Sequence, residues 1–125
     1  MPHKLTTSLL TTVEYHIDQV ANSHGWQLMR PGSAPCVHRR AVAGVKYAEG
    51  QLVALTKVRR ALRRRQETHE AEWACLLVAE LNKWVTLLAG YRQSTHPEPE
   101  WAAYAQGGVD AISNLIATAK ELHAA

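Results

Sequence analysis

The chain has 125 residues, with 14 Lys and Arg, 11 Asp and Glu and a formal net charge of +3. This length is typical of one domain with its own apolar core, so we expect a single domain over residues 1–125. No run of eighteen apolar residues occurs, which argues against a membrane-spanning helix, and the start of the chain lacks the apolar core of a secretion signal. Because the two cysteines are far apart and form no recognisable pattern, the sequence predicts a cytoplasmic protein without disulfides.

Four segments carry apolar residues at helical spacing, and the first spans residues 6–24. Its apolar stripe is formed by Leu9, Val13, Ile17 and Val20. We expect Gly25 to end this helix and residues 25–35 to form a loop, because that stretch contains a Pro-Gly turn.

The second segment runs from about Pro35 to Arg65, which is long for one helix. Gly44 and Gly50 weaken it, and they are compatible with a close helix crossing, a bend or a break. The apolar side continues in phase before and after both glycines. We therefore favour one helix that is bent or briefly interrupted near Gly50.

The third helix is expected from about Thr68 to Tyr91. Its apolar stripe is unusually wide, which predicts that it touches more than one neighbour and is the central helix of the core. A loop over residues 92–99 leads into a fourth helix from about Pro99 to Leu122. Its apolar residues keep the same helical spacing before and after residues 107–108. We therefore interpret that glycine pair as a close-packing notch in one continuous helix.

These elements predict an all-α fold. Four helices joined by short or medium connections are typically arranged as an antiparallel bundle, which we expect here. A break at Gly50 or at the glycine pair 107–108 would give five helices instead of four.

Residues 57–65 stand out because six of these nine residues are Lys or Arg. The wider segment 36–65 holds nine of the fourteen basic residues and only one acid, Glu49. That segment therefore carries a charge of about +8, whereas the rest of the chain carries about −5, and the overall +3 hides the separation.

Periodicity predicts that this helix presents an almost wholly cationic outer face. At about 100° per residue, Lys57, Arg60 and Arg64 fall opposite the apolar side, and the other basic residues flank them or extend the row toward the start of the helix. The expected basic face consists of Arg39, Lys46, Lys57, Arg59, Arg60, Arg63 and Arg64.

Closely spaced like charges repel one another on a helix, and a bound polyanion removes that repulsion. Phosphate groups do so well because Arg can bind them through two parallel hydrogen bonds. A solvated surface that only keeps the protein soluble would show the same residues. The near absence of acids between the arginines favours a surface that binds a partner.

The sequence lacks the spacings that hold a metal ion or a cofactor. Cys36 and His38 form a lone pair, whereas a zinc site requires four ligands. A glycine loop for phosphate and the Gly-x-Ser-x-Gly element of acyl transfer are also missing. We therefore expect no metal and no cofactor.

One spacing points to an enzyme. Arg64 and His69 are separated by four residues, which resembles the Arg-x4–6-His element of HEPN-type ribonucleases. Those proteins are small, all-helical and usually dimeric, so the resemblance implies metal-free cleavage of RNA, with the arginine and the histidine meeting across a dimer. Two features depart from the family: Arg65 stands where a polar residue usually follows the arginine, and the element lies mid-chain instead of near the last helix.

The leading hypothesis is a non-enzymatic protein that binds the phosphate backbone of RNA or single-stranded DNA. Tyr47 is the one aromatic residue within the basic segment, so we expect backbone contacts with little recognition of bases.

In size, helicity and charge the chain is similar to the small helical subunits of CRISPR ribonucleoprotein effectors, which implies other protein subunits as partners. The alternative is an adaptor or inhibitor that docks its basic helix on an acidic protein surface. A membrane partner is not expected, because the apolar side of the helix lacks bulky anchors.

Overall fold

The computed structural model describes residues 4–28, 39–64, 70–95 and 98–124. These residues form four helices and no strand, which confirms the all-α prediction. The helices are α1 (Lys4–Leu28), α2 (Arg39–Arg64), α3 (Glu70–Arg92) and α4 (Pro99–Ala124).

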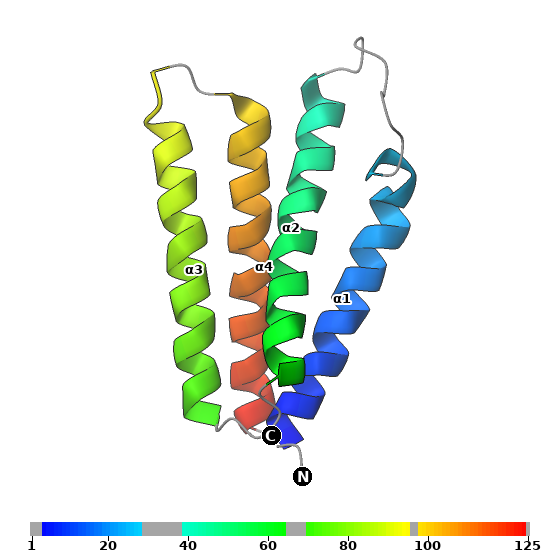
Figure 1. The fold of residues 1–125 in the computed structure, drawn as a ribbon, viewed down its shortest axis with the longest axis vertical. Coiled ribbons are helices and arrows are strands. Elements are labelled where there is room, and N and C mark those ends of the chain that lie inside the picture. The colour runs from blue at the N-terminus through cyan, green and yellow to red at the C-terminus, as the bar shows by residue number, and fades with distance from the viewer. Residues whose placement is uncertain (1–3, 29–38, 65–69, 96–97, 125) are drawn as a thin grey trace.

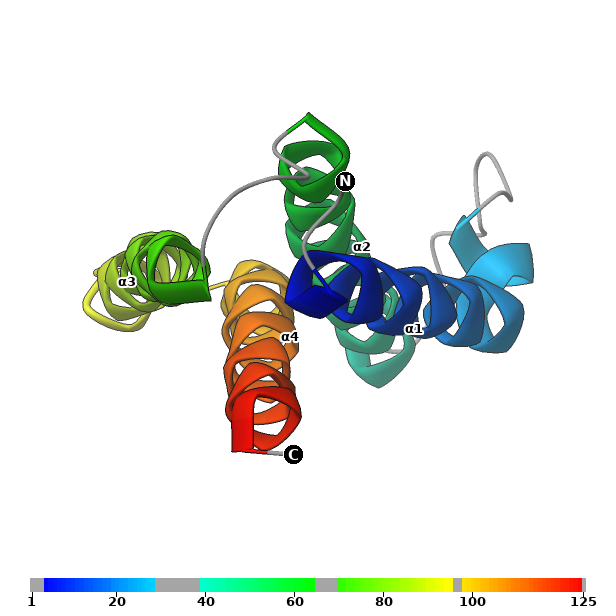
Figure 2. The ribbon, with the colours of Figure 1, turned by 90° about the horizontal axis from the view of Figure 1, so that it is seen from below.

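The four helices alternate in direction, and both ends of the chain lie at the same end of the bundle (Figure 1). Across the molecule their order is α3, α4, α2, α1, so helices that follow one another in sequence are not always neighbours. The view along the helices shows α3 beside α4 and α1 beside α2 (Figure 2). The largest contact joins α2 to α4, which run in the same direction, and α4 also contacts α3 and α1.

The prediction that the third helix is central in the core is therefore wrong. Among the described residues, α3 packs chiefly on α4, and its wide apolar stripe leaves Val78, Val85 and Leu87 exposed. An apolar stripe shows how much of a helix can be buried but not how many neighbours cover it, and here α4 holds the central position.

The predicted end of the first helix needs correction, whereas the predicted start of the second is not tested. Helix α1 continues through Gly25 to Leu28, because a glycine inside a helix weakens it by about 1 kcal/mol but does not by itself end it. Helix α2 begins at Arg39, and the expected start at Pro35 lies outside the described residues. From Arg39 to Arg64 the helix is continuous, so Gly50 does not interrupt it.

Gly50 and Gly107 instead lie where α2 and α4 approach each other closely. A Cβ atom added at Gly50 would meet the carbonyl oxygen of Tyr104, and one added at Gly107 would meet the carbonyl oxygen of Tyr47. At Gly108 an added Cβ would run into the indole ring of Trp84 on α3. These contacts support the interpretation of the glycine pair as a packing notch in a continuous helix, and α4 has a neighbour on each side of it.

The core is built from the apolar faces that the periodicity predicts. Each helix contributes residues three or four apart, which share one face of a helix. The largest of the almost fully buried apolar side chains are Leu9, Val13, Leu62, Trp73, Ile112 and Leu115. No helix within the described ranges is both long and apolar enough to cross a bilayer.

One polar contact lies within this core. The indole nitrogen of Trp73 donates a hydrogen bond to the hydroxyl oxygen of Thr6 at 2.7 Å, and both side chains are almost fully buried. The bond ties the start of α3 to the start of α1, which belong to opposite sides of the bundle.

Replacing Thr6 with valine should lower the free energy of unfolding by about 1–3 kcal/mol, because the buried N–H of Trp73 loses its acceptor while the side-chain volume stays the same. Urea unfolding would measure the change. Thr11→Val is the matched control, since the exposed Thr11 hydroxyl donates only to the carbonyl of Thr7 in its own helix, and a change below about 0.5 kcal/mol is expected there. Equal effects of the two variants would contradict a structural role for the buried bond.

Candidate nucleic-acid interface

All seven residues of the predicted basic face belong to α2. Arg39 is the first residue of the helix, and its side chain lies outside the part of the chain that can be described. The other six are Lys46, Lys57, Arg59, Arg60, Arg63 and Arg64, and each is exposed or half-buried. We call these six residues the α2 basic face.

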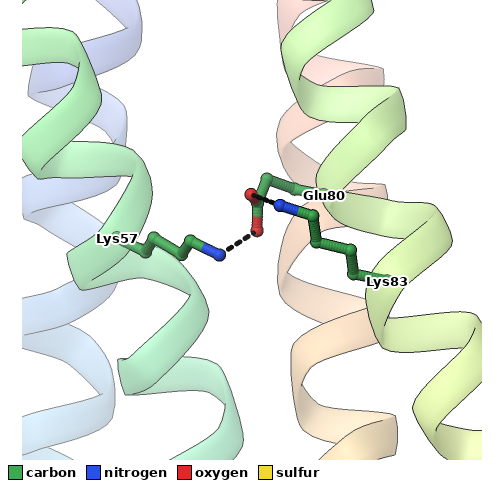
Figure 3. A network of polar contacts seen from close by, with 3 residues as sticks. All are labelled: Lys57, Glu80 and Lys83. Carbon is green, nitrogen blue, oxygen red and sulfur yellow. Dashed lines mark hydrogen bonds and ion pairs between the residues drawn. The ribbon is translucent and has the colours of Figure 1, made fainter.

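On one flank of this face, Lys57 reaches across to α3. Its ammonium group lies 3.1 Å from one carboxylate oxygen of Glu80, whose other oxygen lies 3.2 Å from the ammonium of Lys83. Figure 3 shows this arrangement, in which one carboxylate joins two lysines from different helices. The Glu80 side chain is 17 % exposed, whereas both lysines are more than half exposed.

On the other flank, Arg63 reaches across to α1. Its guanidinium group donates a hydrogen bond to a carboxylate oxygen of Glu14 at 2.8 Å. Both side chains are substantially exposed, so water weakens the attraction between them, and exposed pairs of this kind typically contribute about 0–1 kcal/mol. The flanks of the basic face are thus anchored to the neighbouring helices on both sides.

Between these flanks lie Arg60 and Arg64, which are both exposed, whereas the half-buried Arg59 lies beyond Arg63 on the helix. None of the three forms an ion pair within the described part of the chain. Arg60 and Arg64 are four residues apart, one above the other on the helix, where like charges repel. This pair is the most concentrated unneutralised positive charge of the α2 basic face.

Near the other end of α2, Lys46 has two partners. Its ammonium group lies 3.0 Å from a carboxylate oxygen of Glu49 and 4.8 Å from the ring centroid of Trp101 on α4. Trp101 is 38 % exposed. Sequence reasoning missed this neighbour because Lys46 and Trp101 belong to different helices, and periodicity does not show which helices lie side by side.

Trp101 belongs to an aromatic cluster drawn from two helices. Its ring stacks against Tyr91 with centroids 6.3 Å apart and meets the edge of Tyr104 at 6.0 Å. Tyr104 in turn lies 5.4 Å from the buried Trp84. The cluster therefore continues from the core to the surface beside the α2 basic face.

A polar network holds α2 and α4 in place beneath this cluster. Tyr47 donates a hydrogen bond to Asp110 at 2.5 Å, and Gln106 donates to the other oxygen of the same carboxylate at 2.7 Å. Burial, followed by the contact with Asp110, raises the pKa of Tyr47 to about 12. The phenol therefore keeps its proton and remains a donor, so Tyr47 has a structural role and is not a free aromatic contact.

Most residues of the candidate enzyme and metal elements lie outside the part of the chain that the structure describes. Arg64 is the last residue of α2, while His69, Cys36 and His38 lie outside the described residues, so the arrangement expected of a HEPN-type site stays a prediction. In the described ranges, no three His, Cys, Asp or Glu side chains gather closely enough to hold a metal ion.

The geometry of the α2 basic face and of the aromatic cluster is thus the basis for any statement about function. Comparisons with known protein families, with curated protein sequences and with solved structures give no match for this chain.

Proposed function

We propose that the protein binds the phosphate backbone of RNA or single-stranded DNA through the α2 basic face, without catalysis and as a subunit of a larger nucleoprotein complex. The observation that supports this most strongly is the exposed pair Arg60 and Arg64, which has no carboxylate partner among the described residues. Arginine matches phosphate in geometry and in charge.

The flanking ion pairs favour a ligand of high charge density. Exposed pairs such as Arg63 with Glu14 are worth about 0–1 kcal/mol, whereas cations that bind a row of phosphates also gain free energy by releasing the counterions condensed on the strand. A row of phosphates can therefore recruit Lys57 and Arg63 in addition to Arg60 and Arg64.

Contacts to phosphate fix a protein on nucleic acid without reading its sequence. A face that consists of Lys and Arg alone therefore gives affinity but little specificity, which is the reason for proposing a place beside other subunits. In size, helicity and charge the chain is similar to the small subunits of CRISPR effectors. This similarity agrees with a place beside other subunits, but it assigns no role to any particular residue.

A titration against single-stranded RNA, single-stranded DNA and duplex at several salt concentrations tests the proposal. Log K for a single strand should fall with log salt at a slope of about −0.7 per phosphate contact, or about −3 for four contacts. Absence of binding to any of the three at low salt would reject the proposal and leave an acidic protein surface as the better partner.

The carboxylate of Glu80 offers a test that predicts a gain of affinity. Glu80→Gln releases Lys57 and Lys83, so single-stranded RNA should bind about 2- to 5-fold more tightly, since each released cation can replace a counterion on the phosphates. Fluorescence anisotropy at constant salt measures this. Glu121→Gln is the control, because it makes the same change in net charge at an exposed position of α4. A similar gain of affinity in both variants would mean that net charge alone, not the α2 basic face, sets the affinity.

A further inference from the structure

We propose that Trp101 is a base-stacking site at one end of the α2 basic face, and that the protein therefore prefers single-stranded to duplex nucleic acid. This inference rests on the proposed function and adds a contact with bases to the contacts with phosphate. It also revises the expectation from sequence that aromatic residues contribute little.

Trp101 differs from the two other tryptophans that the structure describes. Trp73 and Trp84 are 2 % and 8 % exposed and belong to the core, whereas Trp101 is 38 % exposed. Its ring is held by Tyr91 and Tyr104 at centroid distances of 6.3 and 6.0 Å. An aromatic ring that is fixed from the protein side and open to solvent loses little conformational freedom when a base stacks on it.

Lys46 connects this ring to the basic face. Its ammonium group lies 4.8 Å from the Trp101 ring centroid, and the residue belongs to the same helix as Arg60 and Arg64. Lys46 and Arg64 are five helical turns apart, so they lie on the same side of α2, separated by about 27 Å along its axis. Arg60 is displaced from that line by about 40°.

A strand that follows this side of α2 from Arg64 therefore arrives at Trp101. Stacked nucleotides rise about 3.4 Å each, so roughly eight nucleotides span the distance between Arg64 and Lys46. This number is within the range of about 4–16 nucleotides bound by known single-strand modules.

Lys46 can exchange its present partners for a phosphate. It interacts with the Glu49 carboxylate and with the ring of Trp101, and both kinds of contact are weak where water has access. When the ammonium group moves to a phosphate, it leaves the ring that it now covers. A base can then stack on Trp101 while its phosphate is held by Lys46.

This arrangement selects for single strands. Every base has an aromatic face, so stacking tolerates any sequence, but in a duplex those faces are already stacked on their neighbours. A duplex would retain the contacts with Arg60 and Arg64 and lose the contact with Trp101.

The test compares a 12-nucleotide single strand with an abasic strand of the same length, which keeps the phosphates and lacks the bases. Wild-type protein should bind the base-containing strand about 5- to 150-fold more tightly, which corresponds to the cost of removing one stacked aromatic side chain. Trp101→Leu should remove that preference and leave the salt dependence unchanged. Trp101→Tyr, which keeps an aromatic face, should retain most of the preference.

Tyr15→Leu is the control for loss of an exposed aromatic residue, since Tyr15 is 59 % exposed on α1, and it should bind as wild type. Equal binding of the two strands by wild-type protein, or an unchanged preference in Trp101→Leu, would overturn the stacking site while leaving phosphate binding intact. Failure of both strands to bind wild-type protein would reject the proposed function itself, and the stacking site with it.

Discussion

Gly107→Ala is expected to lower the free energy of unfolding by about 3 kcal/mol, at the upper end of the cost of overpacking a core. The added Cβ would meet the carbonyl oxygen of Tyr47 and lie 3.1 Å from the amide nitrogen of Gln51. Both obstacles are backbone atoms of a helix, which cannot rotate away as a side chain can. Helices α2 and α4 would have to separate along the largest interface of the molecule.

Gly44→Ala and Gly90→Ala are the matched controls. Both glycines lie within helices, and an added Cβ meets nothing within 4 Å at either position. Alanine should therefore stabilise the protein by about 0.5–1 kcal/mol at these sites, because glycine is the weaker helix former. Urea unfolding of the three variants measures the contrast, and a Gly107→Ala protein as stable as wild type would show that α2 and α4 do not approach so closely.

The double variant Arg60→Glu with Arg64→Glu is expected to weaken binding of single-stranded RNA by at least about 100-fold. Two hydrogen bonds between charged groups are lost, each worth about 1.5–3 kcal/mol, and two carboxylates now repel the phosphates. The fold should survive, because both side chains are exposed and neither has an ion-pair partner among the described residues. Circular dichroism and urea unfolding check the fold, and fluorescence anisotropy measures the affinity.

The double variant Lys4→Glu with Lys120→Glu is the control, since it makes the same change in net charge at exposed positions of α1 and α4. It should lower the affinity only slightly. A loss as large as that of the Arg60 and Arg64 variant would show that binding depends on net charge and not on the α2 basic face.

Much of this fold follows from periodicity. The apolar residues of α1, α2 and α4 recur every three or four positions, which fixes the buried face of each helix and, for α2, the direction in which Arg60 and Arg64 project. Continuity of α4 through residues 107–108 was also predictable, since its apolar phase is unbroken there. A stripe does not identify its partner, however, so the central place of α4 and the exposure of Val78 and Val85 on α3 required the structure.

The candidate interface was predictable to a similar extent. The sequence places the cations on one face of α2 but does not show which carboxylates neutralise them, because Glu14 and Glu80 belong to other helices. The position of Trp101 beside Lys46 was unpredictable for the same reason, since contacts between helices depend on their order in space. These contacts distinguish the anchored flanks of the face from the arginines between them.

The salt dependence of single-stranded RNA binding, measured for wild-type protein and for the Arg60→Glu, Arg64→Glu variant, tests the central claim most directly. If both arginines contact phosphates, the slope of log K against log salt should be shallower in the variant by about 1.4, which corresponds to two lost contacts. The Lys4→Glu, Lys120→Glu control should keep the wild-type slope. Identical slopes for all three proteins would contradict the assignment of the α2 basic face as the phosphate-binding surface.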